Sequence, residues 1–241
     1  MSMQLAFAFE DRNEIGALQE SLRSAVKLPA RPYERLSPMG QLVKSLLSSK
    51  TLDDVSWAAY WRLLERYESW PAMALAKPDE MLETIHPVTY AEDKADHLHR
   101  TLQTVGKIVP DFDLSFLAAW PVMDALRWLE RLPGVGRKVS ASVLNFTSLA
   151  RLAFVADTHI IRILTRQGVL RAGADARIAF ESVMTRCPSW SAQELEELHR
   201  LMKRFGQQTC THSNPQCGSC PVARTCLYTR PRSGARSHAG E

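Results

Sequence analysis

The hydrophobic pattern of this chain has the period of an α-helix almost throughout. Apolar side chains recur at three- and four-residue spacing in short segments that proline, glycine, serine or aspartate separates. Such segments cover residues 15–26, 42–47, 55–64, 95–105, 122–132, 139–144, 160–164, 178–184 and 195–202, and two shorter helices are predicted after Trp70-Pro71 and Lys77-Pro78. No alternating pattern of strand length is present, so the sequence predicts an all-α protein.

Capping residues mark where several of these helices begin. Ser37 precedes a proline and predicts a helix that starts at residue 38, and Ser191 with Glu194 has the pattern of a capping box. Thr51 with Asp54 has the same three-residue spacing and predicts a capping pair for the next helix. Such side chains satisfy backbone N–H groups that the first helical turn leaves without partners.

A turn at residues 132–138, with the sequence LPGVGRK, separates two of the predicted helices. Its two glycines let backbone N–H groups approach an anion without a Cβ in the way, at the positive end of the following helix. Such a turn suits a DNA phosphate. An ordinary glycine-rich connection between helices is the alternative for this run taken alone.

Four of the five cysteines lie within seventeen residues, in the pattern C-x6-C-x2-C-x5-C. They are Cys210, Cys217, Cys220 and Cys226. In an intracellular chain this crowding indicates metal binding rather than a disulfide framework, and both zinc and an iron-sulfur cluster use thiolate ligands. The fifth, Cys187, precedes a proline, and we expect it to be a packed thiol.

Composition limits the class of protein without defining it. The chain has 241 residues, 45% of them hydrophobic, and a formal net charge of +4. It can therefore fill real cores, and it can bind nucleic acid without having to. No run of about 18 apolar residues is present for a membrane span, and the run Leu5–Phe9 is too short for a signal peptide. We expect a soluble intracellular protein.

Three motifs together resemble those of a known family. The run LPGVGRK is followed by VADTHI at residues 155–160, and the four cysteines come later. In this order they resemble the endonuclease III family of helix-hairpin-helix DNA glycosylases, over residues 33–228. The resemblance implies two lobes, with a helical barrel domain at 33–150 and a cluster domain made of 1–32 and 151–228. It also implies a 4Fe-4S cluster on the cysteine loop. From residue 229 onward Arg, Ser, Gly and Pro dominate, so we expect a flexible basic tail at 229–241.

The resemblance assigns the chemistry to Lys138 and Asp157. Lys138 lies at the start of a helix, where the macrodipole and partial burial are expected to lower its pKa and favour the nucleophilic amine. Asp157 is the matching catalytic carboxylate, which stabilises positive charge on the sugar as the base leaves. A phosphate-binding role for Lys138 and a helix N-cap role for Asp157 are the structural alternatives, and for Asp157 both roles can hold together.

DNA contacts are expected from the hairpin and from two loops that depart from the family pattern. Lys50 replaces a glutamine in the first loop, and Tyr90 belongs to a longer second loop. Tyr90 is either a wedge that stacks in the duplex or a core aromatic. The cysteine loop lacks the usual basic residues at 211–216. The full set of expected DNA-binding residues is Lys50, Tyr90, Leu132, Gly134, Val135, Gly136 and Arg137.

The function implied is base-excision repair of duplex DNA that contains a damaged base or an abasic site. We expect a monomeric, cytoplasmic and nucleoid-associated DNA N-glycosylase with AP-lyase activity, acting on oxidised pyrimidines. One alternative is a monofunctional glycosylase of the same superfamily, such as one that resembles the adenine-mismatch enzymes. The other is a non-catalytic DNA-binding iron-sulfur protein, in which the hairpin only clamps phosphates.

Overall fold

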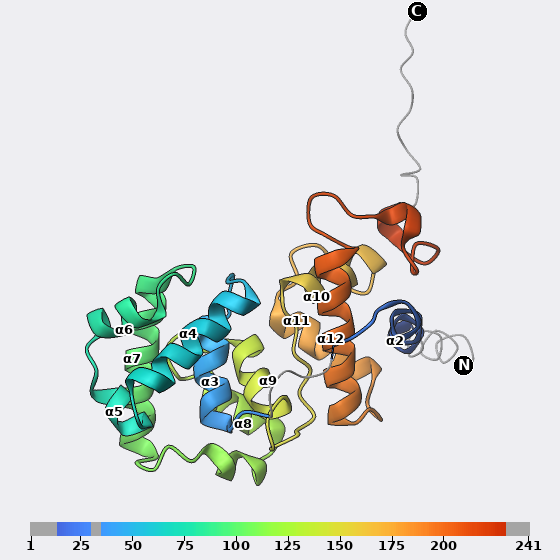
Figure 1. The fold of residues 1–241 in the computed structure, drawn as a ribbon. Helices are drawn as coiled ribbons and strands as arrows, with labels where there is room; N and C mark the ends of the chain where they lie inside the picture. The colour runs from blue at the N-terminus through green and yellow to red at the C-terminus, as the bar shows by residue number, and fades with distance from the viewer. Residues whose placement is uncertain (1–13, 30–34, 230–241) are drawn as a thin grey trace, which may run out of the picture. The chain divides into compact units, whose positions relative to one another are not determined.

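The computed structural model describes residues 14–29 and 35–229 (Figure 1). Every regular element in these ranges is a helix, which confirms the all-α prediction. The α-helices are α2 (Glu14–Ala25), α3 (Pro38–Leu47), α4 (Asp53–Arg66), α5 (Trp70–Leu75), α6 (Pro78–Ile85), α7 (Ala91–Ile108), α8 (Val122–Leu129), α9 (Arg137–Asn145), α10 (Thr158–Gln167), α11 (Ala176–Arg186) and α12 (Ala192–Gln208). The short 3-10 helices are η1 (Leu114–Ala118), η2 (Cys217–Ser219) and η3 (Leu227–Thr229).

The chain divides into two compact units. Unit 1 consists of Met1–Leu28, Ala156–Cys187 and Leu198–Glu241, and unit 2 consists of Pro29–Val155 and Pro188–Glu197. The predicted division placed all of residues 151–228 with the N-terminal helix, so the structure differs in the segments 151–155 and 188–197. Residues 230–241 of the expected tail lie outside the described part of the chain.

Helix α3 is the centre of unit 2, and it packs against α4, α7 and α9 (Figure 1). Its start is the predicted one, because the Ser37 hydroxyl accepts a hydrogen bond from the N–H of Gly40 at 3.1 Å. Nearly all of its side chains are buried. Ser48 is the C-cap residue, and its backbone N–H donates to the Ser45 carbonyl, which fixes the start of the loop that follows α3.

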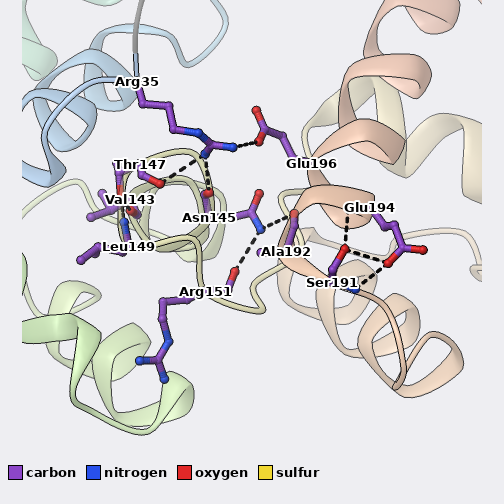
Figure 2. Close-up of polar contacts among 10 residues, drawn as sticks. All are labelled: Arg35, Val143, Asn145, Thr147, Leu149, Arg151, Ser191, Ala192, Glu194 and Glu196. Carbon is purple, nitrogen blue, oxygen red and sulfur yellow. Dashed lines mark hydrogen bonds and ion pairs between the residues drawn. The ribbon is translucent and has the colours of Figure 1, made fainter.

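A polar network joins the segment 188–197 to the rest of unit 2 (Figure 2). The Arg35 guanidinium donates to the carbonyl oxygens of Asn145 and Thr147, both at 3.2 Å, and to the Glu196 carboxylate at 2.7 Å. The Asn145 amide donates to the carbonyl of Ala192 at 3.0 Å. These long-range bonds explain why the first turn of α12 belongs with unit 2, a result that local periodicity cannot predict.

Two of the predicted caps have different outcomes. The box at Ser191 is confirmed, because its N–H donates to the Glu194 carboxylate at 2.7 Å and its hydroxyl accepts from the Glu194 N–H at 3.2 Å. The pair of Thr51 and Asp54 is wrong. Leu52 is the N-cap of α4 and provides no side-chain hydrogen bond, since the Thr51 hydroxyl is used in tertiary contacts instead.

In unit 1, α10 packs against α11 and η3. Phe205 and Phe180 are buried there, and Cys187 is buried as predicted. Within the described ranges, no helix is both long and apolar enough to cross a membrane.

Candidate active site and cysteine pocket

The hairpin before α9 is fixed by contacts with α7. Gly134 has a φ of +73°, a conformation that L side chains rarely adopt. A Cβ at this position would also lie 2.8 Å from the ring of His97. The Pro133 carbonyl accepts a hydrogen bond from the Thr101 hydroxyl at 2.8 Å. Glycine is therefore required at 134 both for the turn and for its close approach to α7.

The expected DNA-binding residues of the hairpin fall into two groups. The side chains of Leu132 and Val135 are buried and anchor the turn in the core of unit 2. Gly136 is exposed, is the N-cap of α9, and has open space where a Cβ would be. The outer edge of the hairpin thus presents backbone rather than side chains to a ligand.

The side chain of Arg137 is turned into the protein. Its Nε donates to Glu130 Oε1 at 2.5 Å, and only 3% of the arginine side chain is exposed. The Ser140 hydroxyl donates to the same carboxylate oxygen at 3.1 Å. Arg137 therefore stabilises the start of α9 through an internal ion pair, and its guanidinium is not at the surface as a DNA contact would require.

Lys138 is the second residue of α9 and is half-buried. Its Nζ donates to the hydroxyl of Ser48 at 3.1 Å. The Ser48 hydroxyl in turn donates to the Ser45 carbonyl at 2.9 Å. The amine of Lys138 is therefore held at the end of α3, beside the loop at residues 48–51.

Lys94 lies near this amine, and the sequence reasoning missed its role. It is 7% exposed, and its ammonium donates to the carbonyls of Leu47 and Ser49 and to the Thr51 hydroxyl, each at 2.7 Å. Burial and, to a lesser extent, the charge of Lys138 together lower the pKa of Lys94 to about 8. The available signal was a lysine four residues before Leu98, on the apolar face of α7.

Lys50 and Tyr90 come together from the two loops that depart from the family pattern. The Lys50 Nζ lies 5.3 Å from the centre of the Tyr90 ring, within the range of a cation–π contact. Both residues have left-handed backbone, with φ of 52° and 57°. Tyr90 is 58% exposed, so the core-aromatic alternative is wrong. The N–H of Thr89 donates to the Thr51 hydroxyl at 3.2 Å, which ties the two loops together.

Asp157 is the N-cap of α10 in unit 1, so this structural role is confirmed. Its Oδ1 accepts from the N–H groups of His159 and Ile160 at 2.9 and 3.0 Å. Burial raises the pKa of this carboxyl, but His199, the Ile160 N–H, His159 and Lys203 outweigh it, and the net pKa is lowered. Asp157 is therefore a carboxylate throughout the neutral range.

The four predicted cysteines line one pocket of unit 1. Cys210, Cys217, Cys220 and Cys226 share it with Arg166 and Tyr228, and none of the thiols is in a disulfide. Burial raises the pKa of the Cys220 thiol, and the other three thiols raise it further. Among the described side chains, no three of the types His, Cys, Asp or Glu are grouped so as to hold one metal ion.

Arg166 provides a hydrogen-bond donor to this pocket. Its Nη1 donates to Cys210 Sγ at 3.2 Å and to the Thr211 carbonyl at 2.7 Å, while Nη2 donates to the His212 carbonyl at 2.8 Å. Its guanidinium also lies 4.5 Å from the centre of the Tyr228 ring. These contacts hold the beginning and the end of the cysteine loop against α10.

Arg162, one turn earlier on α10, connects the start of that helix with the first cysteine. Its Nε and Nη2 donate to the Cys210 carbonyl at 3.0 and 2.8 Å. Nη2 also lies 2.9 Å from the Gly206 carbonyl and 3.0 Å from His159 Nδ1. The sequence analysis missed both arginines, although their four-residue spacing on one helix was a possible signal.

The structure thus brings together two groups of predicted residues. In unit 2, the loop at 48–51 contacts Lys138 and carries Lys50 beside Tyr90. In unit 1, the four cysteines share a pocket with side chains of the helix that Asp157 caps.

Comparisons with known proteins agree with this arrangement. Residues 43–189 match the family described as "HhH-GPD superfamily base excision DNA repair protein". The chain is 27% identical to endonuclease III of Thermotoga maritima over 224 residues, which cover 89% of this chain and 94% of that protein. It is 30% identical to the chloroplastic endonuclease III homolog 1 of Arabidopsis thaliana, covering 77% of this chain but only 48% of that longer protein. A non-covalent endonuclease III–DNA complex has the same fold, with a TM-score of 0.74, 22% identity and coverage of 90% and 96% of the two chains.

The fold and the hairpin define a helix-hairpin-helix protein of base excision DNA repair. Within that superfamily the chain belongs to the endonuclease III family, whose enzyme class is the bifunctional DNA glycosylase and AP lyase.

Proposed function

We propose that this protein removes a damaged base from duplex DNA through Lys138 and then cleaves the strand at the resulting abasic site. The observation that carries the proposal is the placement of the Lys138 amine. It is a half-buried primary amine at the N-terminus of α9, bound to a serine hydroxyl and close to a second, buried ammonium. A helix N-terminus and a neighbouring positive charge both favour the neutral, nucleophilic amine.

The proposed reaction begins when the Lys138 nitrogen attacks C1′ of the damaged nucleotide. An N–C1′ bond forms, the glycosidic bond breaks, and the base leaves with a proton. Opening of the sugar ring gives a Schiff base between the lysine and C1′. Loss of a proton from C2′ then breaks the C3′–O bond and releases the 3′ phosphate. Water finally hydrolyses the Schiff base and restores the amine.

Asp157 supplies the negative charge in this scheme. Both backbone N–H bonds that it accepts go to Oδ1, and we assign Oδ2 to the sugar. A carboxylate there stabilises the positive charge that develops as the base leaves, and it can accept the proton from the attacking amine. Its lowered pKa supports this role, because the group is charged at the pH at which Lys138 must react.

The DNA contacts follow from which parts of the hairpin and loops are exposed. The backbone at Gly134 and Gly136 is the part of the hairpin that we assign to a phosphate. Tyr90 is an exposed ring, and we assign it to fill the gap that a flipped base leaves, with Lys50 beside it. Oxidised pyrimidines are the proposed substrates, on the resemblance to the family.

The cysteine pocket fits a 4Fe-4S cluster. Four thiols line it, and Arg166 donates a hydrogen bond to one of the sulfurs. The four thiolates would hold such a cluster, since thiolates are its usual ligands. The grouping of four thiols around one pocket, with a guanidinium donating to one of them, supports the cluster. Cys210 and Cys226 are also hydrogen-bonded to Arg166 of α10, so these two ligands would tie a bound cluster to that helix.

The decisive experiment is covalent trapping. Protein is incubated with duplexes that carry an AP site or one defined lesion, in the presence of borohydride, which reduces a Schiff base to a stable amine. The native protein should trap and cleave. Lys138→Gln should retain DNA binding and lose trapping, whereas Lys107→Gln, at an exposed position of α7, should behave as the native protein. Trapping that persists in Lys138→Gln would refute the assignment. Excision that leaves the abasic strand intact would indicate a monofunctional glycosylase.

A further inference from the structure

Lys94 is a buried lysine whose three polar contacts lie at the last residue of α3 and in the loop that follows it. It lies in the first turn of α7 and reaches the loop between α3 and α4. The three acceptors, two carbonyls and the Thr51 hydroxyl, each lie 2.7 Å from Nζ. An ammonium has three N–H bonds, and these three acceptors use all of them. The protonated form of Lys94 is therefore the form that this loop fits.

The same loop positions both groups that the proposed function uses in unit 2. The two carbonyls that Lys94 binds, those of Leu47 and Ser49, flank Ser48 on either side. Ser48 is the residue whose hydroxyl accepts from Lys138. The Thr51 hydroxyl links the loop to the N–H of Thr89, the residue before Tyr90. Fixing this loop thus fixes the Lys138 amine and the stacking ring together.

Lys94 and Lys138 also interact through their charges, and the interaction acts in both directions. The charge of Lys138 disfavours the charge of Lys94, so by reciprocity an ammonium at Lys94 disfavours an ammonium at Lys138. Lys94 has three short hydrogen bonds that stabilise its protonated form. An ammonium held in place at Lys94 by these bonds therefore makes protonation of Lys138 less favourable than it would be beside a neutral side chain.

The other charged groups on the helices packed against α7 are engaged elsewhere or exposed. On α3, Lys44 donates to the Ser56 hydroxyl at 3.1 Å. On α6, Glu83 pairs with Arg66, Glu80 accepts from the Lys77 N–H, and Asp79 is exposed, while α5 carries no titratable side chain. The further charged groups near the loop and on α7 are Lys50, Glu92, Asp93, Asp96, His97, His99, Arg100 and Lys107. Besides burial, Lys138 is the group that shifts Lys94.

We propose that Lys94 is a positioning residue for the lyase reaction: its ammonium holds the loop of Ser48, and its charge makes protonation of the nearby Lys138 amine less favourable. The proposal rests on the proposed role of Lys138. It adds a residue that touches neither the DNA nor the reacting atoms and acts through the loop and through charge.

The pH dependence of Lys94 gives this role a distinctive signature. As the pH rises through about 8, folded Lys94 loses its proton, and two N–H bonds remain for three acceptors. Activity should therefore fall on the alkaline side. Because an unfolded lysine keeps its proton to a higher pH, the unfolded state binds more protons from about pH 8 to 10.5, and the contribution of Lys94 to stability rises with pH there. The alkaline loss of activity should thus occur without loss of stability.

The test compares Lys94→Met and Lys94→Arg with Lys44→Met, which removes another buried lysine of unit 2 that binds Ser56. Single-turnover borohydride trapping on AP-site DNA is measured from pH 6 to pH 10, with thermal unfolding and DNA binding measured in parallel. Lys94→Met should slow trapping at pH 7 roughly tenfold and move its acid limb to higher pH, because Lys138 is protonated more easily. Lys94→Arg should keep the trapping rate and lose the alkaline limb near pH 8, and Lys44→Met should keep the native profile.

The outcomes separate this proposal from the proposed function. If the native protein traps and Lys138→Gln does not, the nucleophile stands. A native rate and profile in folded Lys94→Met then overturn the role of Lys94 alone, and so does a slower rate with an unshifted profile, which indicates only structural support. If Lys94→Met fails to fold, Lys94→Arg decides, since an alkaline limb unchanged in that variant contradicts the proposal. A native protein that never traps refutes both.

Discussion

Two helix N-termini of this protein have nearly the same backbone and opposite chemistry. The N-cap of α9 is Gly136, with φ and ψ of −102° and −177°, and the N-cap of α10 is Asp157, with −103° and −177°. Gly136 has no side chain with which to cap its helix. The Asp157 carboxylate accepts two backbone N–H bonds of its own first turn.

The difference shows how one local structure serves two functions. A helix N-terminus attracts negative charge. At α10 the chain supplies that charge itself, so the carboxylate is held in place and its pKa is lowered. At α9 the chain leaves the position to glycine and places Lys138 two residues later. The N-terminus of α10 therefore holds an anion of the chain itself, and the N-terminus of α9 is the one that we propose to receive an anion from DNA.

The largest effect is expected from removing the negative charge at the N-terminus of α10. Asp157→Asn keeps an oxygen that can accept the two N–H bonds, so its cost in stability should be below about 1 kcal/mol. Its loss of negative charge should slow base excision and trapping roughly 10³-fold. Single-turnover kinetics and thermal unfolding measure the two effects. Asp175→Asn, at the exposed N-cap of α11, is the matched control and should change neither. A native rate in Asp157→Asn would leave this aspartate with a capping role only.

A smaller effect is expected from placing a negative charge at the N-terminus of α9. Gly136→Asp should be accommodated, because the backbone there is extended and no atom lies within 4 Å of an added Cβ. The new carboxylate would cap α9 and occupy the phosphate position, so DNA affinity should fall roughly tenfold while the melting temperature is kept or raised. Gly136→Asn caps without charge and should weaken binding less. Equal affinities for the two variants would place the phosphate elsewhere.

The sequence predicted what depends on neighbouring residues and missed what depends on distant ones. Helix starts, the hairpin and the grouping of the cysteines follow from local patterns. The role of Lys94 depends on acceptors 43 to 47 residues away, and Arg162 reaches a carbonyl 48 residues away. The same cause explains the error at Thr51, whose spacing fitted a cap but whose hydroxyl binds Thr89 and Lys94. The sequence also did not predict that the Arg137 guanidinium is buried, because its partner Glu130 lies on the other side of the hairpin and only the folded turn brings the two side chains together.

The smallest effect on the reaction rate is expected from removing the aspartate that caps α11, and this variant separates the capping role of an aspartate from its catalytic role. Asp175 has the backbone of Asp157, with φ and ψ of −105° and −174°, and its Oδ1 accepts the N–H of Ile178 at 2.9 Å. Asp175→Ala should therefore cost about 1 kcal/mol of unfolding free energy, the usual value of a lost N-cap, with trapping and excision within twofold of the native rates. Urea denaturation measures the unfolding free energy, and single-turnover kinetics measure the reaction rates.

A similar loss of stability in Asp157→Ala, joined to a far larger loss of rate, would show that the two aspartates share a structural role and that only one has a chemical role. A rate loss in Asp175→Ala comparable to that of Asp157→Ala would mean that any destabilisation of unit 1 slows the enzyme, and the comparison of the two termini would lose its chemical meaning.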